Sequence, residues 1–132
     1  MRLINWRLNI LKNGSKQAEY DYNTAKAMFS TGRYIYTVFM CHLTIEKALK
    51  GFFAKNIQKN PPKTHDLNYL CKNLNLKLPE ELQRFMDSLN DLSVPTRYPD
   101  EIEKLIKDYN KIRVKDILKI TKRLLSWLKE NI

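Results

Sequence analysis

The amino-acid sequence predicts an all-α fold, an up-and-down bundle of about five helices around one long central helix. Only three glycines and five prolines interrupt its 132 residues, a composition that favours helices over a turn-rich β-fold. Apolar residues recur every three or four positions, as they do along one face of a helix. The segments between these stretches are short, which favours antiparallel neighbours. A chain of this length fits one domain with one core.

Two long helices are predicted in the first half of the chain. The break Asn13-Gly14-Ser15 precedes the first, over about residues 16–30, and Ser15 is able to cap it. The second spans about residues 33–58 and is apolar on several sides, which is typical of a helix at the centre of a bundle. Pro61-Pro62 follows it and prevents its continuation.

Shorter helices and one final long helix are predicted in the second half. Thr64 is a candidate cap for a short third helix, with Asp66 in its first turn. A fourth helix begins at Pro79 and ends before Pro95. A short helix over residues 99–110 and a last one over about 114–129 complete the bundle.

Residues 1–13 are an N-terminal extension of uncertain structure, and residues 14–132 form the helical bundle domain. Ile4, Trp6, Leu8 and Ile10 alternate with polar residues, which is a strand pattern, but the segment also fits one face of a helix. Both readings remain open. Because no other strand is predicted, a strand here would pair with its copy in a second chain.

The overall charge indicates an acidic or polyanionic partner, or a solvated lysine-rich surface. Residues 1–60 hold ten Lys/Arg and three Asp/Glu, a net charge of +7 out of the +10 of the whole chain. Such a surface attracts nucleotides, nucleic acid or acidic proteins. No apolar run approaches the ~20 residues that cross a bilayer, and none resembles a secretory signal. We therefore expect a cytoplasmic protein without membrane segments.

Neither a metal nor another cofactor is predicted. Cys41 and Cys71 are the only cysteines, and each lies among apolar residues of a predicted helix. Only His42 and His65 could join them, at spacings unlike those of zinc sites. We expect two reduced, buried thiols.

The first polar cluster lies on the predicted central helix. His42, Glu46 and Lys50 are four residues apart, so they share one helix face and Glu46 can pair with either neighbour. Because their stripe is otherwise apolar, these groups are expected to be partly buried and to satisfy one another. Taken alone, this cluster is better explained as a structural polar network within the core of the bundle.

Two further clusters follow in loops. Lys63 and His65 lie at the start of the third helix, where free backbone N–H groups suit a phosphate, although Thr-His-Asp is also a good capping sequence. In Arg97-Tyr98-Pro99-Asp100, the arginine suits a phosphate, the tyrosine suits a base, and Asp100 can orient Arg97. An Arg97–Asp100 pair that only stabilises the loop is the alternative.

Taken together, these clusters resemble the HEPN family (higher eukaryote and prokaryote nucleotide-binding). The similarity lies in the run from Phe39 to Gly51, which includes Glu46-Lys47-Ala48-Leu49-Lys50, in Lys63-Thr64-His65-Asp66-Leu67, and in Thr96-Arg97-Tyr98-Pro99-Asp100. A weaker match is Ala18-Glu19-Tyr20-Asp21-Tyr22, where the family usually has Asp followed by Leu. The similarity covers about residues 16–130.

The resemblance implies a helical bundle that is often a homodimer and often encoded beside a minimal nucleotidyltransferase, in a toxin–antitoxin-like arrangement. It implies a nucleotide or other phosphate ligand. The residues that we expect to contact or orient that ligand are Glu46, Lys47, Lys50, Lys63, His65, Arg97, Tyr98 and Asp100.

One departure from the family concerns catalysis. Many HEPN toxins are metal-independent ribonucleases with an arginine four to six residues before a histidine, and neither His42 nor His65 has an arginine at that spacing. The sequence thus favours a non-catalytic binding module. The alternatives are a divergent ribonuclease that uses Arg97 and His65 on RNA, and a module that only binds proteins.

Overall fold

The computed structural model describes residues 14–92 and 99–131 of the chain. Within these ranges every regular element is a helix, which confirms the predicted all-α fold class. The helices are α2 (Gly14–Ser30), α3 (Tyr34–Ile57), α4 (Leu67–Asn73), α5 (Glu80–Asn90), α6 (Pro99–Asp108) and α7 (Lys111–Asn131). The ambiguity over residues 1–13 lies outside the described residues, as do Arg97 and Tyr98.

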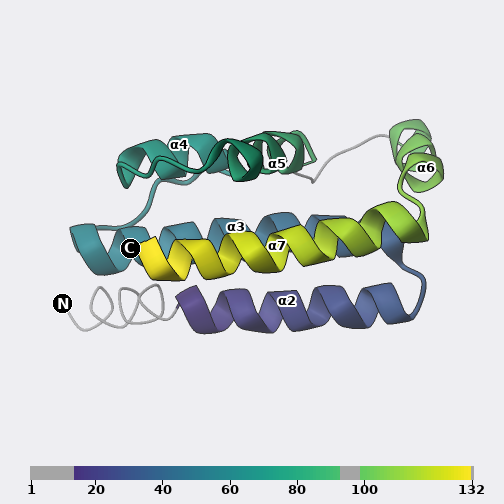
Figure 1. The fold of residues 1–132 in the computed structure, drawn as a ribbon, viewed down its shortest axis with the longest axis horizontal. Coiled ribbons are helices and arrows are strands. Elements are labelled where there is room, and N and C mark those ends of the chain that lie inside the picture. Colours follow the sequence, from purple (N-terminus) through teal and green to yellow (C-terminus); the bar gives the residue numbers. More distant parts are fainter. Residues whose placement is uncertain (1–13, 93–98, 132) are drawn as a thin grey trace.

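Helix α3 is the centre of the bundle, as predicted. It contacts α2, α7, α4, α5 and α6. Figure 1 shows α2, α3 and α7 lying along the long axis, where they contact one another, with α4 and α5 forming a second layer along one side of α3 and α7. The short helix α6 lies at the end of the bundle where the chain turns from α2 into α3 (Figure 1). In the described part of the chain, no helix is long and apolar enough to span a membrane.

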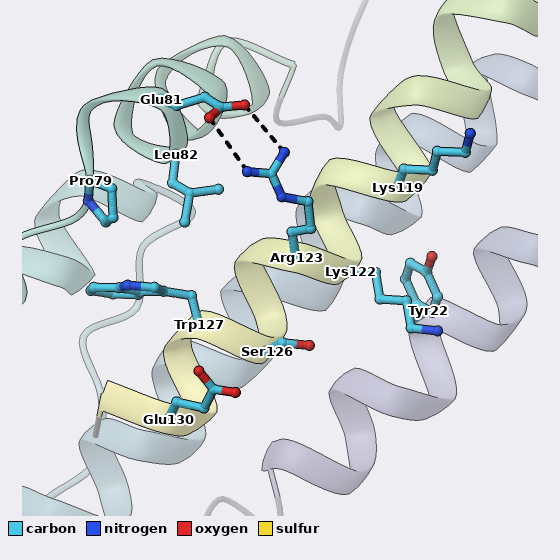
Figure 2. A pocket seen from close by; sticks show the side chains of 10 residues that line it. All are labelled: Tyr22, Pro79, Glu81, Leu82, Lys119, Lys122, Arg123, Ser126, Trp127 and Glu130. Carbon is cyan, nitrogen blue, oxygen red and sulfur yellow. Dashed lines mark hydrogen bonds and ion pairs between the residues drawn. The ribbon is translucent and has the colours of Figure 1, made fainter.

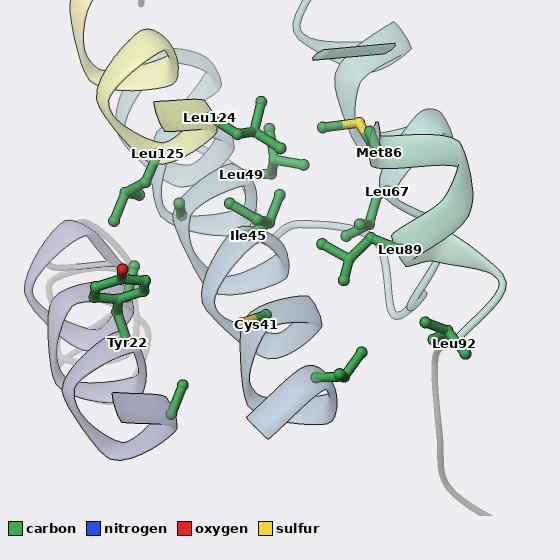
Figure 3. Close-up of a cluster of buried hydrophobic side chains, with 14 of the residues drawn as sticks. Tyr22, Cys41, Ile45, Leu49, Leu67, Met86, Leu89, Leu92, Leu124 and Leu125 are labelled. Atoms are coloured by element: carbon green, nitrogen blue, oxygen red, sulfur yellow. The ribbon is translucent and has the colours of Figure 1, made fainter. Parts of the chain in front are cut away.

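The core lies between α3, α7 and the α4–α5 layer. Ile45 and Leu49 of α3 and Leu124 of α7 are fully buried, and Leu67 and Leu89 meet them from the second layer (Figure 3). Burial of this many large apolar side chains supplies most of the driving force for folding.

Both cysteines belong to this core and are free thiols. Burial raises the pKa of the Cys41 thiol and of the Cys71 thiol to about 12. Cys71 Sγ lies 3.5 Å from Met86 Sδ. At neutral pH both side chains are therefore neutral and behave as small apolar groups.

The capping of α4 differs from the prediction. Asp66, not Thr64, is the N-cap residue, and its Oδ1 accepts hydrogen bonds from the backbone N–H groups of Asn68 and Tyr69 at 3.0 and 3.3 Å. Thr64 Oγ1 instead accepts from the backbone N–H of Asp66 at 3.1 Å. The helix begins two residues later than expected, because the aspartate competes better for the free N–H groups of the first turn.

Helices α2 and α3 approach each other closely at two glycines, Gly14 and Gly51. A Cβ atom added to Gly14 would lie 2.5 Å from Cα of Gly51 and 2.6 Å from the carbonyl oxygen of Lys47. Both are backbone atoms, so no side chain can move aside to make room. A residue without a side chain is therefore required at this crossing.

Gly14→Ala is expected to lower the free energy of unfolding by about 1–2 kcal/mol, because α2 must shift away from α3. Urea unfolding followed by circular dichroism measures the effect. Lys16→Ala, two residues further along and exposed, is the control and should unfold like the parent. A Gly14→Ala protein as stable as the parent would show that this contact is looser than the structure has it.

Candidate functional site

The carboxylate of Glu46 connects α3 to the loop that precedes α4. Glu46 is 4% exposed. Its Oε1 lies 2.7 Å from Nδ1 of His65, and its Oε2 accepts a hydrogen bond from Nζ of Lys50 at 3.2 Å. Three of the residues selected from the sequence thus meet at one buried carboxylate.

The contact with Glu46 determines how His65 presents its ring. A carboxylate can only accept, so Nδ1 of His65 carries the proton in this contact, and in the neutral ring Nε2 is left as an acceptor. The His65 side chain is 62% exposed, whereas that of Lys50 is 20% exposed. The imidazole is therefore held in one orientation while much of its surface faces solvent.

His42 extends the cluster into the core. Its Nδ1 lies 3.9 Å from Oε1 of Glu46, beyond hydrogen-bond distance. Its Nε2 is buried and has no hydrogen-bond partner among the described residues. Burial lowers the pKa of His42, and the charge of His65 adds to that, while the Glu46 carboxylate opposes the shift. Burial dominates, so His42 is neutral at pH 7.

This shift predicts that His42 destabilises the fold in acid. A pKa lower in the folded than in the unfolded state means that unfolding takes up a proton in acid. The part of the free energy of unfolding that depends on neutral His42 is therefore fully present above about pH 6.5 and is lost as the pH falls below it. We expect the free energy of unfolding to decrease more steeply between pH 7 and 5 in the parent than in His42→Asn. One proton limits the difference in slope to about 1.4 kcal/mol per pH unit.

Urea unfolding at several pH values measures this slope, with the two proteins compared at each pH. The comparison cancels the pH dependence that the two proteins share. Equal slopes would show that His42 titrates alike in the folded and unfolded chains.

Lys47 points away from this cluster. Its Nζ lies 2.8 Å from Oδ2 of Asp21, which is buried on α2. The pair therefore joins α2 to α3, on a different side of the central helix from Glu46. Asp21 was not selected from the sequence as a site residue, although it lies in the weak motif of the first helix.

Asn90 is a second residue that sequence reasoning missed. Its Oδ1 accepts from the backbone N–H of Leu67 at 2.8 Å, and its Nδ2 donates to Oδ1 of Asp66 at 3.1 Å. It thereby ties the end of α5 to the start of α4, next to His65. No sequence signal marks it, because the contact joins segments far apart in the chain.

The start of α4 offers side chains rather than backbone groups to a ligand. The Asp66 carboxylate already occupies the N–H groups that the sequence suggested for a phosphate. A phosphate at this position would have to displace it. Lys63 is exposed in the same loop, so Lys63 and His65 remain available to an anion through their side chains.

The third cluster stays a prediction. Asp100 is exposed in the first turn of α6, at the end of the bundle (Figure 1). Within the described ranges, no hydrogen bond or ion pair joins it to Glu46 or His65. Arg97 and Tyr98 lie outside those ranges. The described residues also contain no group of three or more side chains suited to hold a metal ion.

Comparison with known proteins identifies the fold. The sequence model of the HEPN domain family matches residues 14–132. A crystal structure of TT1696 from Thermus thermophilus is similar, with a TM-score of 0.76 and 22% identity over 92% of this chain and 98% of that one. ST0689, an archaeal HEPN homologue, gives a TM-score of 0.70 and 22% identity over 91% and 95%. No protein of curated function matches this sequence.

Proposed function

The chain belongs to the HEPN domain family, and from this premise we propose that it is a non-catalytic binding module. Its ligand is a nucleotide or another phosphate-bearing molecule. Its protein partner is a minimal nucleotidyltransferase, and the module acts in the cytoplasm as a homodimer.

The strongest support for a phosphate-bearing ligand is that the buried carboxylate of Glu46 orients both His65 and Lys50. Donors that are already oriented lose little entropy when a ligand binds. His65 is also largely exposed, so it can reach a phosphate through Nε2 when it is protonated. Lys63, in the same loop, adds a further positive charge.

The remaining predicted residues complete the proposed site. Arg97 binds phosphate with its planar guanidinium, Tyr98 stacks on the base, and Asp100 orients Arg97. Lys47 follows Glu46 on α3 but faces α2, where its ammonium group is paired with Asp21, so it adds positive charge near the site without contacting the ligand.

Calorimetric titration with ATP, GTP and inorganic phosphate tests the ligand. We expect saturable heat for the parent and roughly tenfold weaker binding for His65→Gln and for Lys50→Gln, since a hydrogen bond to a charged group contributes about 1.5–3 kcal/mol. Lys104→Gln on α6, which removes the same charge from an exposed position, should bind as the parent does.

The partner is tested separately, by mixing the purified chain with a minimal nucleotidyltransferase and measuring complex formation by size exclusion. A stable complex is expected, and Arg97→Ala should weaken it. No heat with any nucleotide, together with no loss of partner binding in Arg97→Ala, would overturn the ligand proposal and leave a module that only binds proteins. Absence of a complex would overturn the proposal that the partner is a nucleotidyltransferase.

A second function is favoured by the Glu46–His65 contact, that of a ribonuclease of divergent geometry. A buried carboxylate that holds Nδ1–H leaves Nε2 of an exposed imidazole free to accept a proton from a ribose hydroxyl. Arg97 would stabilise the charge that develops on the phosphate. Incubation with RNA in the absence of metal decides between the two functions. Cleavage that survives unchanged in His65→Ala would show that His65 is not the catalytic base.

A further inference from the structure

A second feature, which shares no residue with the Glu46 cluster, is an open groove of about 810 Å³ along α7. Figure 2 shows it running over α7, with the start of α5 on one side and α2 on the other. Trp127 lies beneath Pro79 and Leu82 at the α5 side. Leu82 is buried in the core and Trp127 is partly buried against it. Their side chains make this part of the groove apolar.

The rim of the groove is charged. The guanidinium of Arg123 on α7 donates two hydrogen bonds to the carboxylate of Glu81 on α5 (Figure 2). Nη1 lies 3.2 Å from Oε1 and Nη2 lies 3.4 Å from Oε2. Lys119 and Lys122 lie exposed on the same helix. Neither has an ion-pair partner within the described part of the chain, although other charges of α7 do: Lys129 pairs with Glu19.

Helix α7 holds much of the positive charge of the protein. Its sequence contains seven Lys/Arg and two Asp/Glu, a net charge of +5 out of +10 for the chain. An apolar centre with an aromatic residue, surrounded by a charged rim, is the usual anatomy of a protein–protein interface. A binding partner complementary to this surface is apolar in its centre and negatively charged at its edges.

We propose that this groove binds an acidic amphipathic helix of a partner protein. Apolar side chains of that helix, spaced three and four residues apart, pack on Trp127, Leu82 and Pro79. Carboxylates on its flanks face Lys119 and Lys122. The proposal does not depend on the phosphate site, since no residue of the groove belongs to the Glu46 cluster.

Charge argues against other occupants. Residues 1–13 contain Arg2, Arg7 and Lys12 and no carboxylate, so the chain's own N-terminal segment would be repelled. Single-stranded nucleic acid carries enough negative charge, but Glu81 and Glu130 in the lining oppose a polyanion. A helix with separated charges can avoid these two carboxylates.

A designed peptide of about 18 residues, with leucines at helical spacing on one face and glutamates on its flanks, is the probe, because shorter isolated helices are marginally stable. The chain has two tryptophans, so a Trp6→Phe background leaves Trp127 as the only indole reporter. We expect a saturable change in Trp127 fluorescence, and about tenfold weaker binding when Lys119→Glu and Lys122→Glu are combined.

The matched control combines Lys104→Glu and Lys107→Glu on α6, which changes the net charge equally but away from the groove. It should bind the peptide like the parent. Three outcomes would overturn the proposal. The first is no saturable change up to about 1 mM peptide. The second is a single-stranded oligonucleotide that binds more tightly than the peptide and loses affinity in the groove variant alone. The third is self-association that the groove variant abolishes, which would assign the groove to a second copy.

Discussion

Glu46→Ala is expected to lower the free energy of unfolding by about 2–3 kcal/mol and to release the loop before α4. The substitution removes the acceptor of two hydrogen bonds and leaves His65 and Lys50 without their partner. Loss of one partner of a fully buried ion pair costs about 3–5 kcal/mol. Here the cost is smaller, since His65 and, to a lesser extent, Lys50 can reach water.

Two measurements separate the global effect from the local one. Urea unfolding gives the free energy, and hydrogen exchange reports faster opening of residues 58–66. Glu80→Ala on α5 removes a carboxylate whose partner is the exposed Arg84, and should leave stability unchanged. If Glu46→Ala exchanged like the parent in this loop, the Glu46–His65 contact would not be what holds the loop to α3.

Leu49→Ala is expected to destabilise the protein by about 2–5 kcal/mol, the range for truncation of a buried leucine. Leu49 is fully buried, and it belongs to α3, which contacts every other described helix. The cavity would open between α3, α7 and the second layer, where rigid neighbours on all sides limit relaxation. The larger end of the range is therefore expected.

Thermal and urea unfolding of Leu49→Ala measure this loss. Ile112→Ala is the matched control, because Ile112 is 84% exposed near the start of α7 and its truncation leaves no cavity. Its stability should stay within about 0.5 kcal/mol of the parent. Similar losses in the two variants would contradict the placement of Leu49 in the core.

The sequence predicted the helices well and their first residues less well. The apolar stripes and the pairs Pro61-Pro62 and Gly14-Ser15 place each helix along the chain, since periodicity and backbone restrictions are local properties. Ser15 and Thr64 were expected to cap helices. In the structure Ser15 lies within α2 and not before it, and Asp66 caps α4. Several residues near a helix start can compete for the same N–H groups, and tertiary contacts select among them.

The candidate site was predictable only in part. The spacing of Glu46 and Lys50 on one helix predicts their contact, because residues four apart stack on one face. The contact between Glu46 and His65 joins segments nineteen residues apart and depends on how the loop crosses α3. Arg97 and Tyr98 stay predictions.

By itself, the sequence determined the all-helical fold, the central position of α3, and the resemblance to the HEPN family. Only the tertiary structure decided that Lys47 turns to Asp21 on α2 and that Asn90 ties α5 to the start of α4. It also decided that an open groove runs along α7 beside Trp127, between α5 and α2. The physical reason is the separation along the chain of the residues that interact. Helix formation and amphipathic faces follow from neighbouring residues, whereas the partner of a polar side chain depends on which helices pack together.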